Sequence, residues 1–432
     1  MSRQMKDSGI PYLGPVPASW DVQKLRYSVK WKSEKGYPDA EVLALYRDYG
    51  VIPKSSRDDN HNVTSLDTST YKYVEIGDFV INKMKAWQGS MGVSSYSGII
   101  SPAYHVCSIT NDDIHRPYFH YLLRNVAYLP EFARLSTGLR IGQWDLSFDD
   151  FRNLPFLLPD KSEQERIANL LDTKCADIDK VIEQTCATIE EYKKLKQAII
   201  TEAVTKGVRG PRPMKPSGVE WIGDIPVGWY TSKAGRFIAS TQNGLTRRDL
   251  SESSGDIVLK LRNITPDGTI DYSAVTRVKL SDAEKTAYTL EKGDFLFVRV
   301  NGSKSLVGKS AIFDGSDEDV AYNDHIIRVR LETNYSRAYF KWFLLSTPGK
   351  TEIDMRTSTS AGQFTISGQE LRNIRLCVPS EEEQQEIATY LDTKCAEIDR
   401  IIEKKEQLIE ELGSYKKSLI YEYVTGKKEV TA

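Results

Sequence analysis

Two long stretches of this 432-residue chain place apolar residues at alternating steps of three and four positions. Neither stretch, residues 162–204 or 382–424, contains a proline. The spacing is the heptad pattern of a coiled coil. We therefore predict two helices of about 43 residues, each roughly 65 Å long at 1.5 Å per residue. A helix of that length cannot bury its apolar seam alone, so the simplest partner of each helix is the other one.

The seam of each predicted helix consists mainly of aliphatic side chains. We expect the helices to pair through Leu171, Ile178, Ile182, Ile189 and Ile199 in the first and Leu391, Ile398, Ile402, Ile409 and Leu419 in the second. Lys196 and Lys416 share one seam position, and two interpretations stay open. A polar residue can fix the register, or its stem can cover the apolar edge while its charge stays in water. Cys175 and Cys395 share another position, where we interpret them as small core residues.

The two helical stretches belong to an internal repeat. Residues 167–205 align without gaps with residues 387–425 at a constant offset of 220. The starts of the two halves match at an offset of 209, because a Gly-x-x-Pro-x-x-Trp pattern ends at Trp20 in one and at Trp229 in the other. The segments between these anchors differ. The chain therefore consists of two copies of one scaffold that present two different surfaces.

The divergent middles, residues 20–158 and 229–378, alternate short apolar runs with turn residues. The strand-like runs are residues 79–81, 257–259, 295–298 and 326–331. One aromatic-rich segment in each middle, 117–123 and 338–344, predicts a core helix. These features predict a mixed α/β (α+β) fold, with two globular domains joined by two long helices in an approximate two-fold duplication.

The repeat also predicts the domain boundaries. The segment after the first helix is rich in glycine and proline and is typical of a linker. The predicted parts are a first globular domain at 1–160, a central helix at 161–206, a linker at 207–214, a second globular domain at 215–379, a C-terminal helix at 380–426 and a tail at 427–432.

Composition is that of an ordinary globular protein, with 40% hydrophobic and 27% charged residues. No apolar run of about 18 residues exists, so we expect no membrane-spanning helix, and the N-terminus shows no signal peptide. The five scattered cysteines are typical of reduced thiols, so we expect a cytoplasmic protein. The net charge of −2 excludes a uniformly basic surface but not a local basic face, because residues 379–432 hold 13 acidic and 8 basic residues.

Several loops of the divergent middles combine basic, amide and aromatic side chains. Arginine reads guanine, asparagine and glutamine read adenine, and lysine meets phosphates. One such loop alone is typical of a solvated surface, but the set on a duplicated scaffold favours a DNA-reading surface. The candidate DNA-contacting residues are Lys83, Lys85, Trp87, Gln88, Arg140, Gln143, Arg262, Asn263, Arg299, Asn301, Lys304, Thr359 and Gln363.

The catalytic patterns that we tested do not fit. Residues 302–310 resemble a phosphate-binding loop, but five residues rather than four separate the glycines, and we predict a hairpin instead of a following helix. His105, Cys107, His115 and His120 match no zinc spacing. The sequence also shows no dinucleotide fingerprint, no Asn/Asp-Pro-Pro-aromatic motif and no serine nucleophile elbow. We therefore expect no catalytic residue, no metal and no cofactor in this chain.

The duplicated pattern resembles the specificity (S, HsdS) subunits of type I restriction–modification systems over essentially the whole chain. The resemblance rests on the two Gly-x-x-Pro-x-x-Trp segments and on the entries to the twin helices. These entries read Pro-x-x-x-Glu-Gln-Glu-x-Ile-Ala from Pro159 and Pro-x-x-x-Glu-Gln-Gln-x-Ile-Ala from Pro379. A Leu-Asp pair follows in both copies, at Leu171 and Leu391.

The resemblance implies two target-recognition domains joined by antiparallel helices, which act as a molecular ruler. Each domain would read one part of a split, asymmetric site on double-stranded DNA. The helices would bind two methyltransferase subunits, and restriction subunits would join that core. S-adenosylmethionine, ATP and Mg²⁺ would belong to those partners. Two alternatives stay open, namely a coiled-coil scaffold without DNA specificity and, with less support, a nuclease or ATPase built on residues 302–310.

Overall fold

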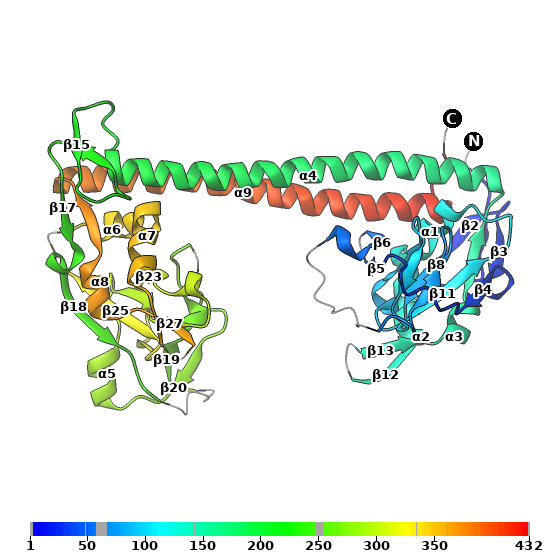
Figure 1. Ribbon diagram of the computed structural model, residues 1–432, viewed down its shortest axis with the longest axis horizontal. Helices are drawn as coiled ribbons and strands as arrows, with labels where there is room; N and C mark the ends of the chain where they lie inside the picture. Colours follow the sequence, from blue (N-terminus) through cyan, green and yellow to red (C-terminus); the bar gives the residue numbers. More distant parts are fainter. Residues whose placement is uncertain are drawn as a thin grey trace. The chain divides into compact units, whose positions relative to one another are not determined.

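The computed structural model describes residues 3–47, 49–57, 67–140, 143–247, 254–265, 267–333, 335–360 and 362–430 (Figure 1). The chain forms two compact units. The first unit combines Met1–Cys186 with Glu406–Ala432, and the second is Ala187–Lys405. Each unit thus takes residues from both long helices. The predicted mixed α/β fold with two long helices is confirmed.

The first unit is built on an antiparallel four-stranded sheet in the order β4-β11-β8-β9. Its strands are β4 (Val29–Lys32), β11 (Tyr104–Ile109), β8 (Phe79–Asn82) and β9 (Met91–Val93). Short antiparallel pairs surround the sheet: β1 (Met5–Asp7) with β2 (Pro15–Pro17), β3 (Asp21–Lys24) with β14 (Pro155–Leu158), β5 (Leu43–Tyr46) with β6 (Gly50–Pro53), β7 (Lys72–Val74) with β10 (Gly98–Ile100), and β12 (Ser136–Arg140) with β13 (Gln143–Leu146). The helices are α1 (Arg116–Leu123), α2 (Leu129–Leu135) and α3 (Phe148–Arg152).

The second unit repeats this sheet in the order β18-β25-β21-β23. Its strands are β18 (Ile238–Asn243), β25 (Ile326–Leu331), β21 (Phe295–Val298) and β23 (Ser310–Ile312). A further three-stranded sheet holds β20 (Thr276–Val278), β19 (Asp256–Leu259) and β24 (Val320–Tyr322), with β19 and β24 parallel. The other strands are β15 (Met214–Pro216), β16 (Asp224–Pro226), β17 (Tyr230–Lys233), β22 (Val300–Asn301), β26 (Ser358–Ser360), β27 (Gln363–Thr365) and β28 (Arg375–Val378). The helices are α5 (Asp282–Tyr288), α6 (Arg337–Leu345), α7 (Thr347–Arg356) and α8 (Gly368–Asn373).

The local predictions agree with these elements. The four strand-like runs lie in β8, β19, β21 and β25, and the two aromatic segments lie in α1 and α6. Successive side chains of a strand point to opposite faces of the sheet, so a continuous apolar run such as β21, which is buried at every position, fits a sheet covered on both faces. The linker is one residue shorter than expected, since Met214 already belongs to β15.

The two long helices are α4 (Lys161–Lys206) and α9 (Glu381–Val424). Each begins after a proline and a polar capping residue. The Asp160 carboxylate accepts a hydrogen bond from the Glu163 amide at 2.9 Å, and the Ser380 hydroxyl accepts one from the Glu383 amide at 3.3 Å. These bonds satisfy amide groups that lack a partner in the first turn of a helix.

Within each unit the two helices lie side by side and share one hydrophobic core (Figure 1). In the first unit, Leu171 near the start of α4 and Leu419 near the end of α9 belong to the same core. In the second unit, Val204 at the end of α4 and Leu391 near the start of α9 do so. The start of one helix therefore lies beside the end of the other, which is the antiparallel pairing that the resemblance implied.

The structure buries only part of the expected seam. The buried pairing residues are Leu171, Ile178, Ile189, Leu391, Ile398 and Leu419, and the half-buried ones are Ile182, Ile199, Ile402 and Ile409. At the end of α4, Ile200 rather than Ile199 is the fully buried side chain. Cys175 and Cys395 are both buried. Burial raises the pKa of the Cys395 thiol to about 11, as expected for a core residue.

The two seam lysines both form ion pairs with the facing helix. Lys196 Nζ lies 2.6 and 2.7 Å from the two carboxylate oxygens of Asp399, within the second unit. Lys416 Nζ lies 2.6 Å from both carboxylate oxygens of Asp179, within the first unit. The two aspartates are themselves equivalent at the offset of 220. These contacts favour the interpretation that the lysines fix the register, although their partly exposed positions also keep the charges in water.

The Gly-x-x-Pro-x-x-Trp motif docks on the first turn of the long helix that follows it. The Trp20 indole N–H donates to the Glu163 carboxylate at 2.9 Å, and the Trp229 indole N–H donates to Glu383 at 2.8 Å. Both indoles are almost completely buried, at 0% and 1% exposure. A buried indole N–H needs an acceptor, and this need explains why the motif and the helix entry recur together.

The glutamine beside each of these glutamates holds the aromatic helix. The Gln164 side-chain oxygen accepts from the His115 amide at 2.9 Å, and the Gln384 oxygen accepts from the Ser336 amide at 2.9 Å. His115 and Ser336 are the N-cap residues directly before α1 and α6. The Glu-Gln pair of each helix entry thus ties two separate segments to one helix turn.

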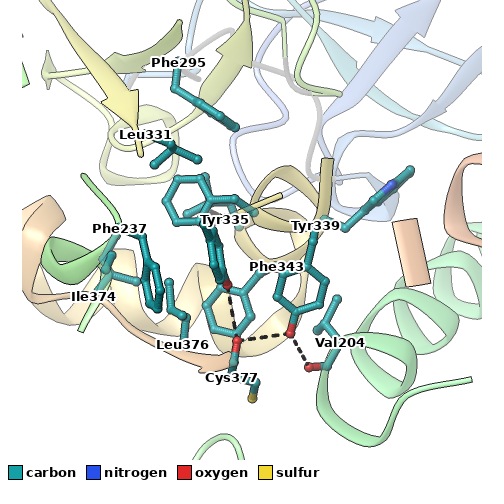
Figure 2. Close-up of a cluster of buried hydrophobic side chains, with 14 of the residues drawn as sticks. Val204, Phe237, Phe295, Leu331, Tyr335, Tyr339, Phe343, Ile374, Leu376 and Cys377 are labelled. Carbon is teal, nitrogen blue, oxygen red and sulfur yellow. Dashed lines mark hydrogen bonds between the residues drawn. The ribbon is translucent and has the colours of Figure 1, made fainter. Parts of the chain in front are cut away.

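Figure 2 shows how the second unit encloses the end of α4. The Tyr339 hydroxyl on α6 donates to the Val204 carbonyl at 3.1 Å and lies 3.3 Å from the Cys377 carbonyl on β28. The Tyr335 hydroxyl also donates to the Cys377 carbonyl, at 3.3 Å. All of these groups are buried. The last turn of α4 is therefore part of the core of the second globular domain.

The first unit repeats this arrangement with the end of α9. The Tyr118 hydroxyl on α1 lies 3.3 Å from the Val424 carbonyl and 3.4 Å from the Leu157 carbonyl on β14. Val424 and Leu157 are the equivalents of Val204 and Cys377 at the offset of 220. Each globular domain is thus completed by the end of the long helix that belongs to the other repeat.

Candidate nucleic-acid interface

Two of the predicted DNA-reading loops meet in the first unit. The loop after β8 contains a short 3₁₀ turn, Ala86–Gln88, and it lies against the β12–β13 hairpin. The Leu146 amide donates to the Lys83 carbonyl at 3.0 Å, and Lys83 Nζ forms an ion pair with the Asp145 carboxylate at 3.0 Å. The Trp87 and Trp144 rings meet edge to face at 5.1 Å. One surface therefore combines cationic, amide and aromatic groups from two loops.

The equivalent loops meet in the second unit. Arg299 follows β21 as Lys83 follows β8, and the hairpin formed by β26 and β27 corresponds to the β12–β13 hairpin. Asn301 on β22 pairs with Phe364 on β27, and the Ile366 amide donates to the Arg299 carbonyl at 3.0 Å. The same two loops thus come together in both units, although their sequences differ.

The candidate residues of the loop pairs differ in how accessible their side chains are. Lys85, Lys304, Thr359 and Gln363 are exposed, and Lys83, Trp87, Gln88, Arg299 and Asn301 are half-buried. The side chains of Arg140 and Gln143 lie outside the described residues, and only their strand positions in β12 and β13 are known.

Intramolecular contacts hold part of this set in place. The Arg299 guanidinium donates to the Asp324 carbonyl at 3.0 Å, and the Asn301 side-chain oxygen accepts from the Ser303 amide at 2.9 Å. Such contacts limit rotamer freedom, so less conformational entropy is lost when a ligand binds. Arg299 and Asn301 are therefore partly preorganised.

Asn263 has a structural role and was wrongly expected to contact DNA. Its side chain is 1% exposed. The side-chain oxygen accepts from the Lys260 amide at 2.8 Å, and the side-chain nitrogen donates to the Asp271 carbonyl at 2.8 Å. An amide that is buried and bonded at both ends cannot reach a base edge. The neighbouring Arg262 is exposed. It lies beside the three-stranded sheet β20-β19-β24, where its guanidinium is 3.5 Å from the Thr276 hydroxyl on β20.

Trp144 and Asp145 complete the loop pair of the first unit, but the sequence-based list of contacting residues names neither, although Trp144 ends the candidate loop 137–144. The repeat offset of 220 contains a signal for Trp144, because it places Gln143-Trp144 opposite Gln363-Phe364. The repeat alignment gives no comparable indication for Asp145. Its role follows only from its ion pair with Lys83.

The residues of the rejected catalytic patterns form strands and hydrogen bonds within the fold. Residues Ser310–Ile312, which follow the glycine-rich loop, form strand β23 rather than a helix. His105 Nε2 lies 3.1 Å from the Leu146 carbonyl, and His120 Nδ1 accepts from the Val93 amide at 3.1 Å. Within the described ranges, no three His, Cys, Asp or Glu side chains are grouped in a way that suits a metal ion. Among the helices in those ranges, none is both long enough and apolar enough to cross a membrane.

Comparisons with known proteins agree with this geometry. The family model for the type I restriction modification DNA specificity domain matches residues 20–191 and 229–411. The type I restriction enzyme StySPI specificity subunit of Salmonella potsdam is 26% identical over 324 residues, covering 73% of this chain and 65% of that protein. The EcoKI specificity subunit of Escherichia coli (strain K12) is 23% identical over 318 residues, covering 73% and 66%. The chain thus matches slightly less than two thirds of the length of these relatives.

Two solved structures share the fold. One is a chain from work on complex assembly and conformational transition of the type I R-M system, with a TM-score of 0.71, 14% identity, and coverage of 96% of this chain and 99% of that one. The other is the HsdS subunit from Thermoanaerobacter tengcongensis, with a TM-score of 0.50, 13% identity, and coverage of 96% and 98%. Because the family model matches both repeats and most of the sequence, this chain belongs to the type I restriction modification DNA specificity family.

Proposed function

We propose that this chain is the DNA-recognition subunit of a type I restriction–modification complex and that each loop pair reads one half of a split site. The observation that carries the proposal is the meeting of equivalent loops in both units, with different residues in each. A repeated scaffold with two unlike reading surfaces fits a bipartite, asymmetric sequence. The similarity to the StySPI and EcoKI specificity subunits supports the same role.

The side chains of the loop pairs suit double-stranded DNA. Lys85 and Lys304 supply exposed positive charge for phosphates, while Gln363 supplies an amide that can pair with an adenine edge. Arg299 offers a partly anchored guanidinium, the group that most often reads guanine. The near-neutral net charge of −2 fits a subunit whose partners supply further phosphate contacts.

We propose that catalysis belongs to partner subunits, namely two methyltransferase subunits and the restriction subunits. S-adenosylmethionine, ATP and Mg²⁺ would be bound there. Partly exposed aliphatic side chains on the long helices support docking of such partners. They include Val181 and Leu195 on α4, at 43% and 48% exposure, and Ile401 and Leu408 on α9, at 37% and 41%. Two of these residues lie in each unit, and exposed apolar side chains mark an interaction face where they form a contiguous patch.

Methylome sequencing tests the function directly. A methylation-competent host would carry the chain together with its methyltransferase. We expect a split, asymmetric, adenine-methylated motif that disappears when this chain is deleted. If the complex assembles and no motif appears, the recognition role is wrong, and a coiled-coil scaffold without DNA specificity becomes the better description.

A loop substitution separates the two half-sites. Gln363→Ala should relax or change the half of the motif that is read by the second unit and leave the other half unchanged. The nuclease or ATPase alternative has its own test in Lys309→Ala. If the wild-type activity depends on nucleotide and Lys309→Ala removes that dependence, the nuclease or ATPase alternative is favoured. If the methylated motif is unaltered in the variant and the wild-type activity does not depend on nucleotide, the alternative is excluded.

A further inference from the structure

A half-exposed tryptophan lies beside the first loop pair. Trp31 is on β4, at the edge of the four-stranded sheet, and 53% of its side chain is exposed. Its ring centroid lies 6.0 Å from that of Phe148 and 6.5 Å from that of His105. Two further rings therefore hold the indole in one orientation while much of it remains in water.

The surroundings of Trp31 are positively charged. Lys72 Nζ lies 5.8 Å from the centroid of the indole ring. A hollow of about 620 Å³ opens beside the ring, and its lining includes Arg26, Lys30 and Arg152 together with one acidic residue, Asp149. Asp149 forms an ion pair with Arg152 at 2.9 Å. The lining of the hollow therefore carries more basic than acidic side chains, and it lies beside the flat face of the Trp31 indole.

Contacts through His105 link Trp31 to the loop pair of the first unit, and Ser147, which lines the hollow, directly follows β13. His105, which packs against Trp31, contacts the Leu146 carbonyl at the end of β13 through Nε2, at 3.1 Å. The neighbouring Asp145 pairs with Lys83 of the other loop. Burial lowers the pKa of the His105 imidazole, and the positive charges of Lys72 and Lys83 lower it further. Trp31 therefore extends the candidate DNA surface rather than forming a separate one.

Among the described residues, the lining of the hollow contains hydroxyl and basic groups but neither asparagine nor glutamine. Its hydroxyl groups come from Thr110 and Ser147. Amide side chains usually read adenine edges and arginine can read guanine, but most contacts that basic and hydroxyl groups make to DNA go to phosphates and sugars. The chemistry of the hollow therefore fits a sugar–phosphate backbone better than a base edge.

Within the described part of the second unit, the positions equivalent to Trp31 and Phe148 carry no aromatic ring. Trp31 pairs with Cys107, which pairs with Phe79, and the corresponding strand positions are Thr241, Val329 and Phe295. Thr241 thus stands where Trp31 stands in the first unit. Gly368, the first residue of α8, stands where Phe148 begins α3. Thr241 is therefore the matched control position for substitutions of Trp31.

We propose that Trp31 and the basic hollow beside it bind the DNA backbone next to the half-site that the first unit reads, as an anchor that does not depend on sequence. The indole covers a deoxyribose, and the basic side chains meet the adjoining phosphates. This inference rests on the proposed function. It adds an asymmetric contact, because the first unit holds its half-site more tightly than its base contacts alone would allow.

The test uses the chain in complex with its methyltransferase and duplexes that carry the methylated motif. Wild-type methylation must first yield a motif, and failure at that step overturns the proposed function itself. Binding is then measured by fluorescence anisotropy over a range of salt concentrations for Trp31→Ala, Trp31→Phe, Thr241→Ala and the double variant Arg26→Ala/Arg152→Ala.

We expect Trp31→Ala to weaken binding about tenfold on cognate and non-cognate duplexes alike, with an unchanged motif. Trp31→Phe should recover most of that loss, and Thr241→Ala should bind as the wild type does. The double arginine variant should lower the slope of log K against log salt by about 2, since each lost phosphate contact changes it by about 0.9. Trp31→Ala should leave this slope unchanged.

Three results would overturn the inference while leaving the proposed function intact. Trp31→Ala could bind with wild-type affinity, which would show that the ring does not touch DNA. It could change the motif, which would make Trp31 a base reader. It could instead release the methyltransferase from the complex, which would assign the hollow to a protein partner. A melting temperature within about 2 °C of the wild type separates all three from a folding defect.

Discussion

At the scale of single residues, two glutamates explain why the repeated motifs of this chain occur together. Glu163 accepts from the buried Trp20 indole and forms an ion pair with Arg3 at 2.7 Å. Glu383 accepts from the Trp229 indole and pairs with Arg212. Each carboxylate thus ties the beginning of a globular domain to the long helix that follows it. Loss of either carboxylate leaves a buried N–H without an acceptor.

Glu383→Ala should therefore lower the free energy of unfolding of the second unit by about 1–3 kcal/mol, the usual cost of an unsatisfied buried donor. Glu383→Gln keeps an acceptor for the indole and should cost less. Urea unfolding followed by tryptophan fluorescence measures both variants. Equal losses would show that the charge, and not the hydrogen bond, stabilises this site.

His120 links stability to pH. Burial and the nearby Arg124 charge lower its pKa from 6.5 to about 3, so the folded protein keeps the imidazole neutral. The unfolded chain takes up a proton near pH 6.5 and the folded chain does not, so this contribution is complete above pH 6.5 and is lost as the pH falls towards 3. Between pH 7.5 and 5 the loss should be about 2 kcal/mol.

His120→Asn keeps a side-chain oxygen for the Val93 amide but cannot titrate. The stability difference between wild type and variant, measured by urea unfolding at pH 7.5 and at pH 5, should therefore shift in favour of the variant by about 2 kcal/mol at the lower pH. Parallel pH profiles would mean that the imidazole titrates normally in the folded protein.

At the scale of elements, the two helices pair with the same contact in each unit. Lys196 faces Asp399 in the second unit, and Lys416 faces Asp179 in the first. The aspartate side chains are more than half exposed, at 55% and 58%, so each pair should contribute only about 0.2–1 kcal/mol. The value of such pairs lies in fixing the register, because a slipped helix would lose both of them.

Charge reversal tests this pairing. Lys196→Glu brings like charges together and should destabilise the second unit, whereas Lys196→Glu/Asp399→Lys should recover most of the loss. A double-mutant cycle by urea unfolding should give a coupling energy of up to about 1 kcal/mol. The equivalent cycle with Lys416 and Asp179 is the matched control, and no coupling in both cycles would contradict a role in register.

The sequence predicted the elements better than it predicted the site, and the reasons are physical. Heptad spacing repeats along the whole of α4 and α9, so many positions agree on one structure. A single loop residue has no such redundancy. Asn263 has the amide of a base reader, yet it is buried in a turn. Trp31 is of a residue type usual in cores, yet it is half-exposed, because it lies on an edge strand and its position depends on contacts with Phe148 and His105 that are distant in the sequence.

At the scale of the whole molecule, the two repeats are interleaved. Val424 ends the second repeat but is buried in the first unit, and Val204 ends the first repeat but is buried in the second. The pattern of apolar residues indicated that these helix ends need a partner, but it did not show which globular domain provides it. That choice depends on contacts between segments that are far apart in the sequence.

The two valines form a matched pair of tests. Val424→Ala should destabilise the first unit by about 1–3 kcal/mol and leave the second unchanged, and Val204→Ala should do the reverse. Hydrogen exchange by mass spectrometry localises each effect, since local opening raises exchange only in the affected unit. If each variant loosened the globular domain of its own repeat instead, the interleaving would be wrong.

The interleaving also determines which part of this protein evolution can replace. Tyr118 and Tyr339, the two tryptophan motifs and the Glu-Gln pairs all bind backbone groups or each other, so they close any globular domain whatever its loops contain. None of these contacts involves a residue of the candidate DNA-reading loops. A replacement globular segment therefore needs only a tyrosine equivalent to Tyr118 or Tyr339, a final strand equivalent to β14 or β28, and the tryptophan motif at its start. Under the proposed function, exchange of one such segment would change one half of the DNA target while the frame that holds it stays the same.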